Sequence, residues 1–352
     1  MKTISLRACR SVVLLMLPAL LVAQTAEQPL VNKIGTSGFV DLYYGINFNR
    51  PISRTNMLHV FDQRSDEIRL SLAELVVEQQ PSPVGFRLDV GFGPTNDAVH
   101  YQDPSSTTNF LQQAYFSAVV PVGSGITVDI GKFVTHMGYE LIESKDNWNY
   151  SRSFLFGYAI PFFHVGARAS YQIVDGMKFT GYLYNGWDRG VTDNNSAKTL
   201  GATVNISATP STGIILNWIG GPELADGSDE LHVFDLIVTS TLSDQISVGM
   251  NADYGFSESS IGTSIWKGVA LYGRVSLADN LFLAARGEYF MDLNGVRTGV
   301  PQDAKELTLT LEHKFAGALL TRIEFRRDVC TTPFFDDNHA QNTFVLGTIV
   351  SF

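Results

Sequence analysis

Residues 304–327 read AKELTLTLEHKFAGALLTRIEFRR, and they alternate between apolar and polar side chains on both sides of a short Ala316-Gly317 link. A period of two is typical of a β-strand with two different faces, and Gly next to a small residue is typical of a tight turn. The stretch therefore predicts a β-hairpin with one apolar face and one charged face. The apolar face carries Leu307, Leu309, Leu311, Leu319, Ile323 and Phe325, and the other carries Glu306, Thr308, Thr310, Glu312, Arg322, Glu324 and Arg326.

The same alternation recurs along the chain and predicts about 16 strands, an even number, as bacterial single-chain barrels have. The phase of the second strand slips near Glu74, which indicates a bulge, because Ile68, Leu70 and Leu72 share one face only before that point. The fourth strand is less regular than the rest. The expected strands are 38–48, 67–79, 86–92, 110–120, 125–134, 163–173, 177–187, 198–208, 213–220, 230–241, 245–256, 266–277, 280–291, 304–315, 317–327 and 341–352.

Short and long links alternate between these strands. The short ones have turn chemistry, such as Asp175-Gly176 and Asp279-Asn280. Outer-membrane barrels have short periplasmic turns and longer external loops, and we expect the longer class here at 49–66, 93–109, 134–161, 188–197, 220–229, 257–265, 292–303 and 328–340. A soluble β-sandwich or propeller also alternates apolar and polar residues. The two classes of link favour one all-β transmembrane antiparallel barrel.

The N-terminus predicts a cleaved signal peptide over residues 1–23, with basic residues before an apolar run of about 11 residues. That run is too short to span a bilayer as a helix, which needs about 20 residues. Cleavage moves the formal charge from -10 to -13 and leaves Cys330 as the single cysteine. An acidic chain is a poor partner for nucleic acid, which binds basic surfaces. Residues 24–352 contain no linker or low-complexity tract, so we expect one barrel domain.

The last stretch, residues 342–352, places Phe344, Leu346, Val350 and Phe352 on one face of a strand. An alternating strand that ends on an aromatic residue resembles the C-terminal signal by which the barrel assembly machinery recognises outer-membrane proteins. We therefore expect that machinery as a partner, and the lipid of the outer membrane as the surroundings.

The longest link, 134–161, is aromatic and lies between the fifth and sixth expected strands. Long loops without secondary structure are usually functional or disordered, and this composition argues against disorder. We expect the loop to fold into the lumen and to narrow it, with Trp148, Tyr150, Phe154 and Phe156 as anchors. The alternative is a loop that lies over the rim or packs on a neighbouring subunit.

Charged residues of this loop and of the inward strand faces are the candidate pore-lining and constriction residues. An Arg that faced lipid near the midplane would cost about 2 to 4 kcal/mol, so the strand arginines are assigned to the lumen. Rings of charge set selectivity in channels, and the prediction is a constriction that is acidic on the side of the loop and basic on the side of the wall arginines. The loop set is Glu140, Glu143, Lys145, Asp146 and Arg152, and the wall set is Arg168, Arg274, Arg286 and Arg322.

With these residues in place, the chain resembles the OmpL-like putative β-barrel porin family of Gram-negative bacteria over almost its whole length. The most specific parts are Gly131-Lys132-Phe133, the run 147–153 and the run 161–168. The resemblance implies an outer-membrane porin that allows passive diffusion of small hydrophilic solutes and ions. It implies no particular solute and no catalytic residue. A homotrimer is compatible with a pore of this size.

Sequence motifs for catalysis are not found. The seven histidines are scattered, with no H-x-x-x-H pair, and no Gly-rich phosphate motif stands between a strand and a helix. We therefore expect no enzyme activity, no cofactor and no metal. Two alternatives remain open: an outer-membrane hydrolase whose Ser, His and Asp come from separate strands, and a closed barrel that acts as an adhesin or receptor through its external loops.

Overall fold

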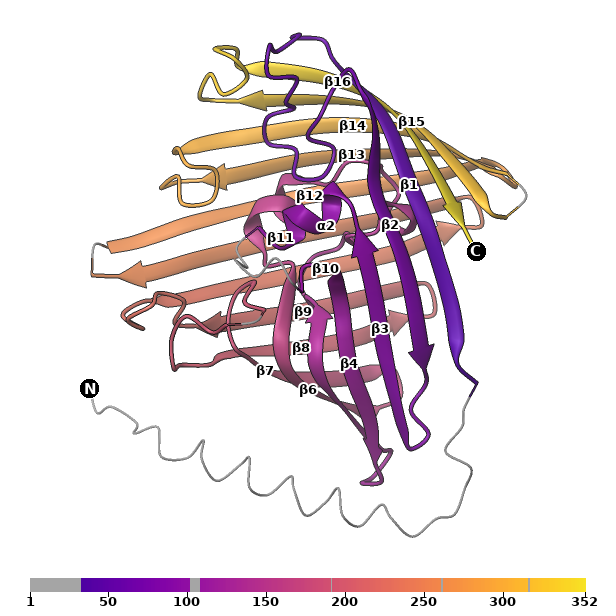
Figure 1. Cartoon of the computed structure of the whole chain (residues 1–352), viewed down its shortest axis with the longest axis vertical. Coiled ribbons are helices and arrows are strands. Elements are labelled where there is room, and N and C mark those ends of the chain that lie inside the picture. The colour runs from indigo at the N-terminus through magenta and orange to yellow at the C-terminus, as the bar shows by residue number, and fades with distance from the viewer. Residues whose placement is uncertain (1–32, 102–107, 191, 261, 316) are drawn as a thin grey trace.

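The computed structural model describes residues 33–101, 108–190, 192–260, 262–315 and 317–352, and the predicted signal peptide at 1–23 lies outside them. The described residues form 16 strands in one closed antiparallel barrel, in which each strand pairs with its neighbours in sequence (Figure 1). This confirms the predicted fold class. The strands are β1 Gly35–Asn47, β2 Ile68–Gln79, β3 Val84–Phe92, β4 Leu111–Val120, β5 Ile126–Val134, β6 Phe163–Val174, β7 Met177–Tyr184, β8 Thr199–Thr209, β9 Thr212–Gly221, β10 Glu230–Ser243, β11 Ile246–Ser259, β12 Gly262–Ala278, β13 Leu281–Asp292, β14 Gln302–Phe315, β15 Leu319–Cys330 and β16 Ala340–Ser351.

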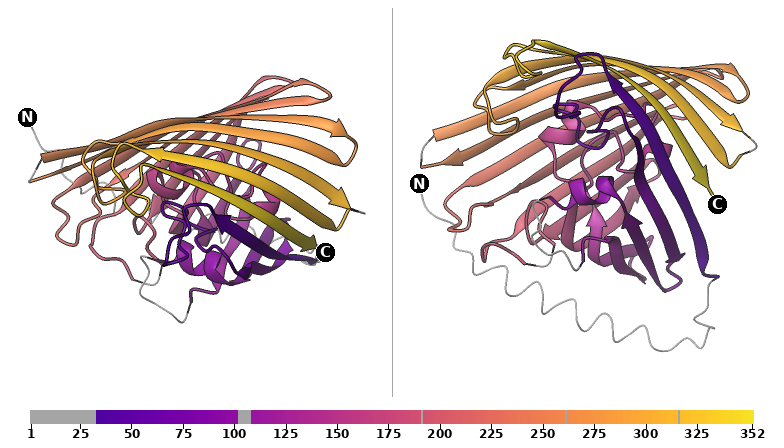
Figure 2. Two further views of the ribbon diagram at one scale, coloured as in Figure 1. Left: turned by 90° about the horizontal axis from the view of Figure 1, so that it is seen from above. Right: turned by 45° about the horizontal axis from the view of Figure 1, so that its top comes forward.

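Pairing of β1 with β16 closes the barrel, from Phe39 opposite Ser351 to Asn47 opposite Thr343. The start of β1 and the end of β16 therefore lie at the same rim, which also carries the short turns. The wall differs in height, because β7 has 8 residues and β12 has 17. Two further views show the long strands of the second half curving over segments that lie inside the barrel (Figure 2).

Alternation decides which side chains face outward. In β1, Val40 and Leu42 are about 40% exposed on the outer surface, whereas Asp41 and Tyr43 are 2% exposed and face inward. Leu307 and Leu309 of β14 are likewise outside, with Thr308 and Thr310 buried inside. Apolar side chains thus face outward and polar ones inward, which is the pattern of a barrel in lipid.

Two β-bulges re-aim side chains in the first strands. The pairing of β1 with β2 skips Ser71, so Ser71 and Leu72 are both buried. The bulge lies three residues before Glu74, and the prediction that Leu72 shares the outer face with Leu70 is wrong for this reason. A second bulge in β4 skips Gln112, so Gln112 and Gln113 both face inward, which explains why that strand alternates poorly.

One predicted long loop is absent from the described chain. The link expected at 257–265 is part of a hairpin, because β11 continues to Ser259, β12 starts at Gly262, and the two pair to their ends. Polar residues such as Glu258 and Thr263 continue the strand pairing above the apolar band. The change to polar residues therefore indicates where the strands leave the lipid and not where they end.

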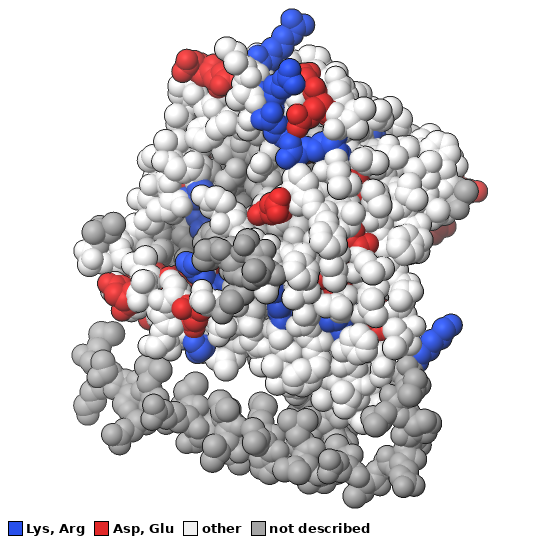
Figure 3. All heavy atoms as spheres, viewed as in Figure 1, with Lys and Arg blue, Asp and Glu red and all other residues white. Residues whose placement is uncertain are grey.

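In the part of the chain that the structure describes, helical structure lies inside the barrel and in its loops. The α2 helix, Pro94–Val99, follows β3, and the segment between β5 and β6 contains the 3₁₀ turn η3, Ser144–Asp146, and the π-helical turn η4, Leu155–Ala159. Of the helices that the structure describes, none is long and apolar enough to cross a membrane. Charged side chains gather at the top of the space-filling view, over the loop between β1 and β2, and much of the remaining face is uncharged (Figure 3).

Candidate functional site

The segment 135–162, here called the lumen loop, leaves β5, crosses the inside of the barrel and returns to β6. It contacts the far wall and not only its own strands. Tyr150 donates its hydroxyl to Asp41 of β1 at 3.0 Å, and Asn149 donates to Thr310 of β14 at 2.7 Å. The lumen loop therefore spans the barrel, as expected for the connection between the fifth and sixth strands.

Two glutamates of the far wall accept backbone N–H groups of the lumen loop. Glu324 of β15 accepts from Tyr150 at 2.5 Å and from Ser151 at 2.9 Å. Glu288 of β13 accepts from Phe154 and Leu155, both at 2.6 Å. Each carboxyl group therefore fixes two consecutive N–H groups of an irregular backbone, at 150–151 and at 154–155.

Arginines of the same wall hold the loop carbonyls and one loop carboxylate. Arg286 contacts Glu140 at 2.6 Å and donates to the Ser151 carbonyl at 2.7 Å. Arg322 donates to loop carbonyls, including that of Asn147, and pairs with a wall carboxylate, Glu312, at 2.7 Å. Both guanidinium groups are at most 1% exposed. Buried charges need such partners, so these two arginines hold the lumen loop against the wall.

Apolar packing completes the attachment. Leu155 and Phe156 of η4 belong to a buried cluster with Trp266 and Phe290, which point inward from β12 and β13. The Trp266 indole N–H donates to the Ala159 carbonyl at 3.0 Å. Burying aromatic and aliphatic side chains is worth about 1.5–3 kcal/mol each, so the lumen loop has its own core inside the barrel.

The loop between β1 and β2 also reaches the lumen. Phe61 of this loop packs against Phe156 and Phe162 of the lumen loop. His59 bonds to Asp62 at 2.7 Å and to Asp328 of β15 at 2.9 Å. Burial alone would lower the pKa of His59, but the nearby carboxylates raise it to about 9, so the imidazolium carries both bonds.

Cavities lie on both sides of the lumen loop. One of about 630 Å³ opens toward the short-turn rim, and one of about 560 Å³ lies toward the long loops. A smaller one of about 170 Å³ shares Val134, Leu141 and Glu143 with the first and Phe162 with the second. The smallest cavity, here called the throat, thus shares lining residues with each of the other two, and the cavity toward the long loops is here called the outer cavity.

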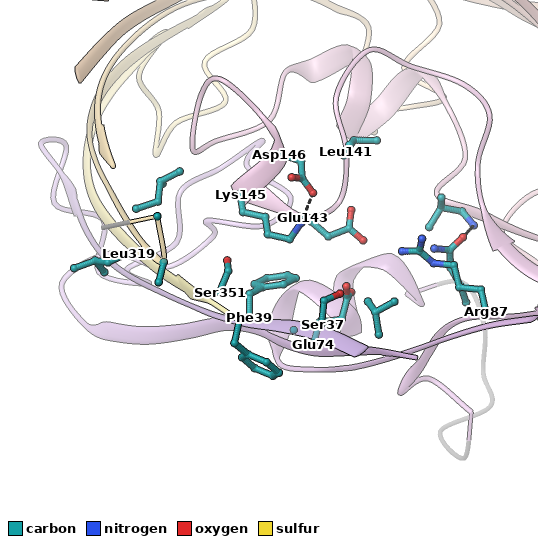
Figure 4. Close-up of a pocket in the computed structure, with 18 of the residues that line it drawn as sticks. Ser37, Phe39, Glu74, Arg87, Leu141, Glu143, Lys145, Asp146, Leu319 and Ser351 are labelled. Carbon is teal, nitrogen blue, oxygen red and sulfur yellow. Dashed lines mark hydrogen bonds and ion pairs between the residues drawn. The ribbon is translucent and has the colours of Figure 1, made fainter. Parts of the chain in front are cut away.

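The cavity of about 630 Å³ near the short-turn rim, here called the vestibule, is lined by charged side chains from two sides. Figure 4 shows Glu143, Lys145 and Asp146 on the side of the lumen loop and Glu74 and Arg87 on the side of the wall. Arg168 of β6 lines it too and pairs with Asp129 at 2.7 Å. Burial raises the pKa of Glu143. In the throat, burial lowers the pKa of His136 to about 4, so this ring is neutral near pH 7.

The predicted constriction residues fall into two groups in space. Four of them are buried where the lumen loop meets the far wall: Glu140, Arg152, Arg286 and Arg322. Four others line the vestibule: Glu143, Lys145, Asp146 and Arg168. Arg274 is near the short-turn rim, paired with Glu312 at 2.5 Å. Their role in a constriction stays a prediction.

Sequence reasoning did not single out several vestibule residues. Glu74 sits just beyond the bulge that confused the phase of β2, and Gln113 adjoins the bulge of β4. Arg87 was assigned to the lumen face but not to the constriction. Alternation in β3 would have found Arg87, whereas Glu74 and Gln113 lie next to bulges that change which side chains face inward.

A closed 16-stranded barrel with apolar residues outside, polar residues inside and a loop folded into its lumen defines the porin class of outer-membrane proteins. Within that class, residues 33–352 match the family described as "Putative beta-barrel porin-2, OmpL-like". The chain belongs to this family, and the family resemblance seen in the sequence is confirmed.

Solved structures of outer-membrane proteins share the fold. The chain is similar to the anion-selective porin from Comamonas acidovorans, with a TM-score of 0.62, 10% identity and coverage of 91% of this chain and 99% of that chain. Salmonella typhi OmpF, solved in complex with daunomycin, has a TM-score of 0.62 and 13% identity, with coverage of 91% of this chain and 98% of that chain. Vibrio cholerae OmpT in its trimer form has a TM-score of 0.60 and 13% identity, with coverage of 91% of this chain and 99% of that chain. At these identities the likeness concerns the fold. Among curated protein sequences, none matches the chain.

Proposed function

We propose that the protein is an outer-membrane pore through which small hydrophilic solutes and ions diffuse passively, narrowed by the loop at 134–161. The observation that carries the proposal is the succession of vestibule, throat and outer cavity along that loop. Sixteen strands are enough to enclose an aqueous channel. The apolar outer wall suits the outer membrane of a Gram-negative bacterium, where the family and its structural neighbours are found.

The lining of the vestibule suits hydrophilic solutes of either charge. Glu74, Glu143 and Asp146 are balanced there by Arg87, Lys145, Arg168 and Lys314. Charged rings of one sign give strong selectivity, whereas this mixture favours weak selectivity among small ions. The throat carries Glu140, Thr135 and the neutral His136, so size is the main filter.

The two rival functions have less support. A hydrolase built on His59 would need one free ring nitrogen to accept a proton from a nucleophile, but both nitrogens face carboxylates. A closed barrel acting as an adhesin or receptor would not need a lined route along the lumen loop. We therefore propose a channel with no catalytic step.

Single-channel conductance of the refolded protein tests the proposal. Leu141 is 45% exposed and lines both the vestibule and the throat. Leu141→Ala should raise the conductance and Leu141→Trp should lower it, because the first widens the route and the second fills it. Leu309, 44% exposed on the outer wall, provides the matched control, and Leu309→Trp should leave the conductance unchanged.

A folded, inserted barrel that conducts no ions would contradict the pore. Deleting residues 139–153 is the coarser test and should also raise the conductance. That deletion removes the partners of Arg286 and Arg322 as well, so the single substitutions give the cleaner result. Assembly as a homotrimer, as in the trimer form of Vibrio cholerae OmpT, is part of the proposal and is tested by the mass of the detergent-solubilised protein.

A further inference from the structure

Two carboxylates that face each other beside the vestibule have no cationic partner. Glu74 points inward from β2 and is 6% exposed, and its Oε2 is buried without a hydrogen bond. Glu143 comes from the lumen loop and lies near enough to repel it. Among the described residues, neither carboxylate forms an ion pair. Buried charges are normally paired or bound to a metal, so the buried Glu74 needs an explanation, with the half-buried Glu143 beside it.

Two buried amide oxygens at the same place also lack donors. Asn96 of α2 is 3% exposed and Gln112, the bulged residue of β4, is 1% exposed. The amide nitrogen of Asn96 donates to the Asn109 carbonyl, and that of Gln112 donates to Glu143 at 2.5 Å. These bonds fix the orientation of each amide. The opposite atoms, Asn96 Oδ1 and Gln112 Oε1, are then left without a partner.

These oxygens converge on Gly91. A Cβ placed on Gly91 would lie 3.3 Å from Asn96 Oδ1 and 3.3 Å from Gln112 Oε1. Gly91 of β3 is also directly opposite Glu74 in the sheet, where side chains on one face are about 4.5–5.5 Å apart. The place that a side chain of residue 91 would occupy is therefore bordered by amide oxygens from α2 and β4 and by a methyl group of Leu72, with Glu74 directly opposite on β2.

We infer that Glu74, Asn96, Gln112 and Glu143 bind a divalent cation of the size of Ca²⁺ beside Gly91. Carboxylate and amide oxygens at irregular positions are the ligands that Ca²⁺ accepts, at 2.3–2.6 Å, whereas Mg²⁺ demands near-ideal octahedral geometry. Two negative charges favour a divalent over a monovalent ion. The site has fewer than three acidic, His or Cys ligands, and no group of three or more exists among the described residues.

The neighbouring basic residues leave the site negative. Arg87 is paired with Asp89 at 2.9 Å, and Lys145 is paired with Asp146. A bound cation would connect four elements, namely β2, α2, β4 and the lumen loop. It would thus hold the lumen loop against β2 and β4, the side of the barrel opposite Arg286 and Arg322. The inference concerns binding and stands whether or not the pore conducts.

Calorimetric titration of Ca²⁺ into the folded, metal-stripped protein in detergent tests the site. Wild type should bind one Ca²⁺ per chain. Glu74→Gln/Glu143→Gln should weaken binding by more than about tenfold, the low end of the loss seen when even an outer-shell partner of a metal is removed. Glu258→Gln, which changes an exposed acid at the far end of β11, should leave the affinity unchanged.

A second variant guards against a fold defect in the first. Gly91→Ala removes no charge and no ligand, and its Cβ would meet only the ends of flexible side chains, so the barrel should fold while the cation is displaced. Weakened binding by Gly91→Ala and by the double variant supports the site. Wild type that binds no Ca²⁺, or binding that survives both changes, would overturn it.

Discussion

The two sides of the lumen carry the same residue types in different states. On one side, β13 to β15 present Arg286 and Arg322, which are at most 1% exposed and bonded to the lumen loop. On the other side, β3 and β6 present Arg87 and Arg168, with side chains 32% and 24% exposed and their ion pairs made within the wall. We call these the anchoring wall and the open wall.

The difference shows what an inward arginine does in this barrel. Strand alternation places all four arginines in the lumen, but the lumen loop covers only one set. On the anchoring wall a guanidinium replaces water with loop carbonyls and buried carboxylates, which strengthens each interaction because the local dielectric is low. On the open wall the same group remains partly hydrated and is available to a passing ion.

The largest expected effect comes from removing one anchor. Arg286→Met leaves Glu140 and Glu306 buried without their cation, and breaking a buried pair in this way destabilises by about 3–5 kcal/mol. Arg87→Met, the matched change on the open wall, should destabilise less, because Arg87 is 32% exposed and its partner Asp89 keeps the hydrogen bond from Gln113. The midpoint of denaturant unfolding in detergent measures both. Equal losses for the two variants would erase the distinction between the walls.

A neutral substitution on the anchoring wall should have an intermediate effect. Glu324→Gln keeps the size of the side chain but removes the charge that accepts the Tyr150 and Ser151 N–H groups. Hydrogen bonds to charged groups contribute about 1.5–3 kcal/mol, so we expect a loss in that range and larger current noise as the loop loosens. Glu258→Gln is the control. A quiet channel of unchanged stability would show that Glu324 does not hold the loop.

Ion selectivity should respond most strongly on the open wall. Arg168→Gln removes a positive charge from the vestibule and should shift the reversal potential in a KCl gradient toward cation selectivity. Arg274→Gln removes the same charge from a residue outside the vestibule lining and should shift it less. If the Arg274 variant shifts selectivity as much as the Arg168 variant, the vestibule is not the part of the route that sorts ions.

A pH-dependent effect concerns the exit of the lumen loop, where Asp188 accepts the N–H groups of Phe162 and Phe163 at 2.5 and 3.2 Å. Burial raises the pKa of Asp188 to about 7. The folded state then binds this proton more tightly than the unfolded state, so the contribution of Asp188 to stability falls as pH rises from about 4 to 7. Unfolding midpoints across that range should fall less for Asp188→Asn, and identical slopes would exclude this role.

Much of the fold could be predicted from the sequence, because every strand of a barrel alternates between apolar side chains that face lipid and polar side chains that face the lumen. The 16 strands, their pairing order and the place of the longest loop follow from alternation and turn chemistry. The exceptions have local causes. The bulges at Ser71 and Gln112 change which side chains face inward, and the hairpin at 257–265 is polar yet fully paired. A bulge does not change which residue types a strand contains, and a strand that continues above the membrane has the polar composition of a loop. Neither feature can therefore be recognised from residue types alone.

The candidate site could be predicted only in part. The sequence places Glu140 and Glu143 in the same loop, three residues apart. The structure buries the first against Arg286 and turns the second to the vestibule. That division depends on how the lumen loop folds across the barrel, which depends on contacts 100 or more residues away, such as Tyr150 with Asp41. Alternation specifies a face, and the loop then decides which part of that face meets solute.

Thiol block of single channels tests most directly whether the conducting route passes through the vestibule, between the lumen loop and the open wall. Lys145 borders the vestibule, whereas Thr310 is buried on the anchoring wall beneath the lumen loop. In a Cys330→Ser background, a charged thiol reagent should lower the conductance of Lys145→Cys channels in discrete steps and leave Thr310→Cys channels unchanged. Block at Thr310→Cys with none at Lys145→Cys would place the route on the other side of the loop and contradict the account.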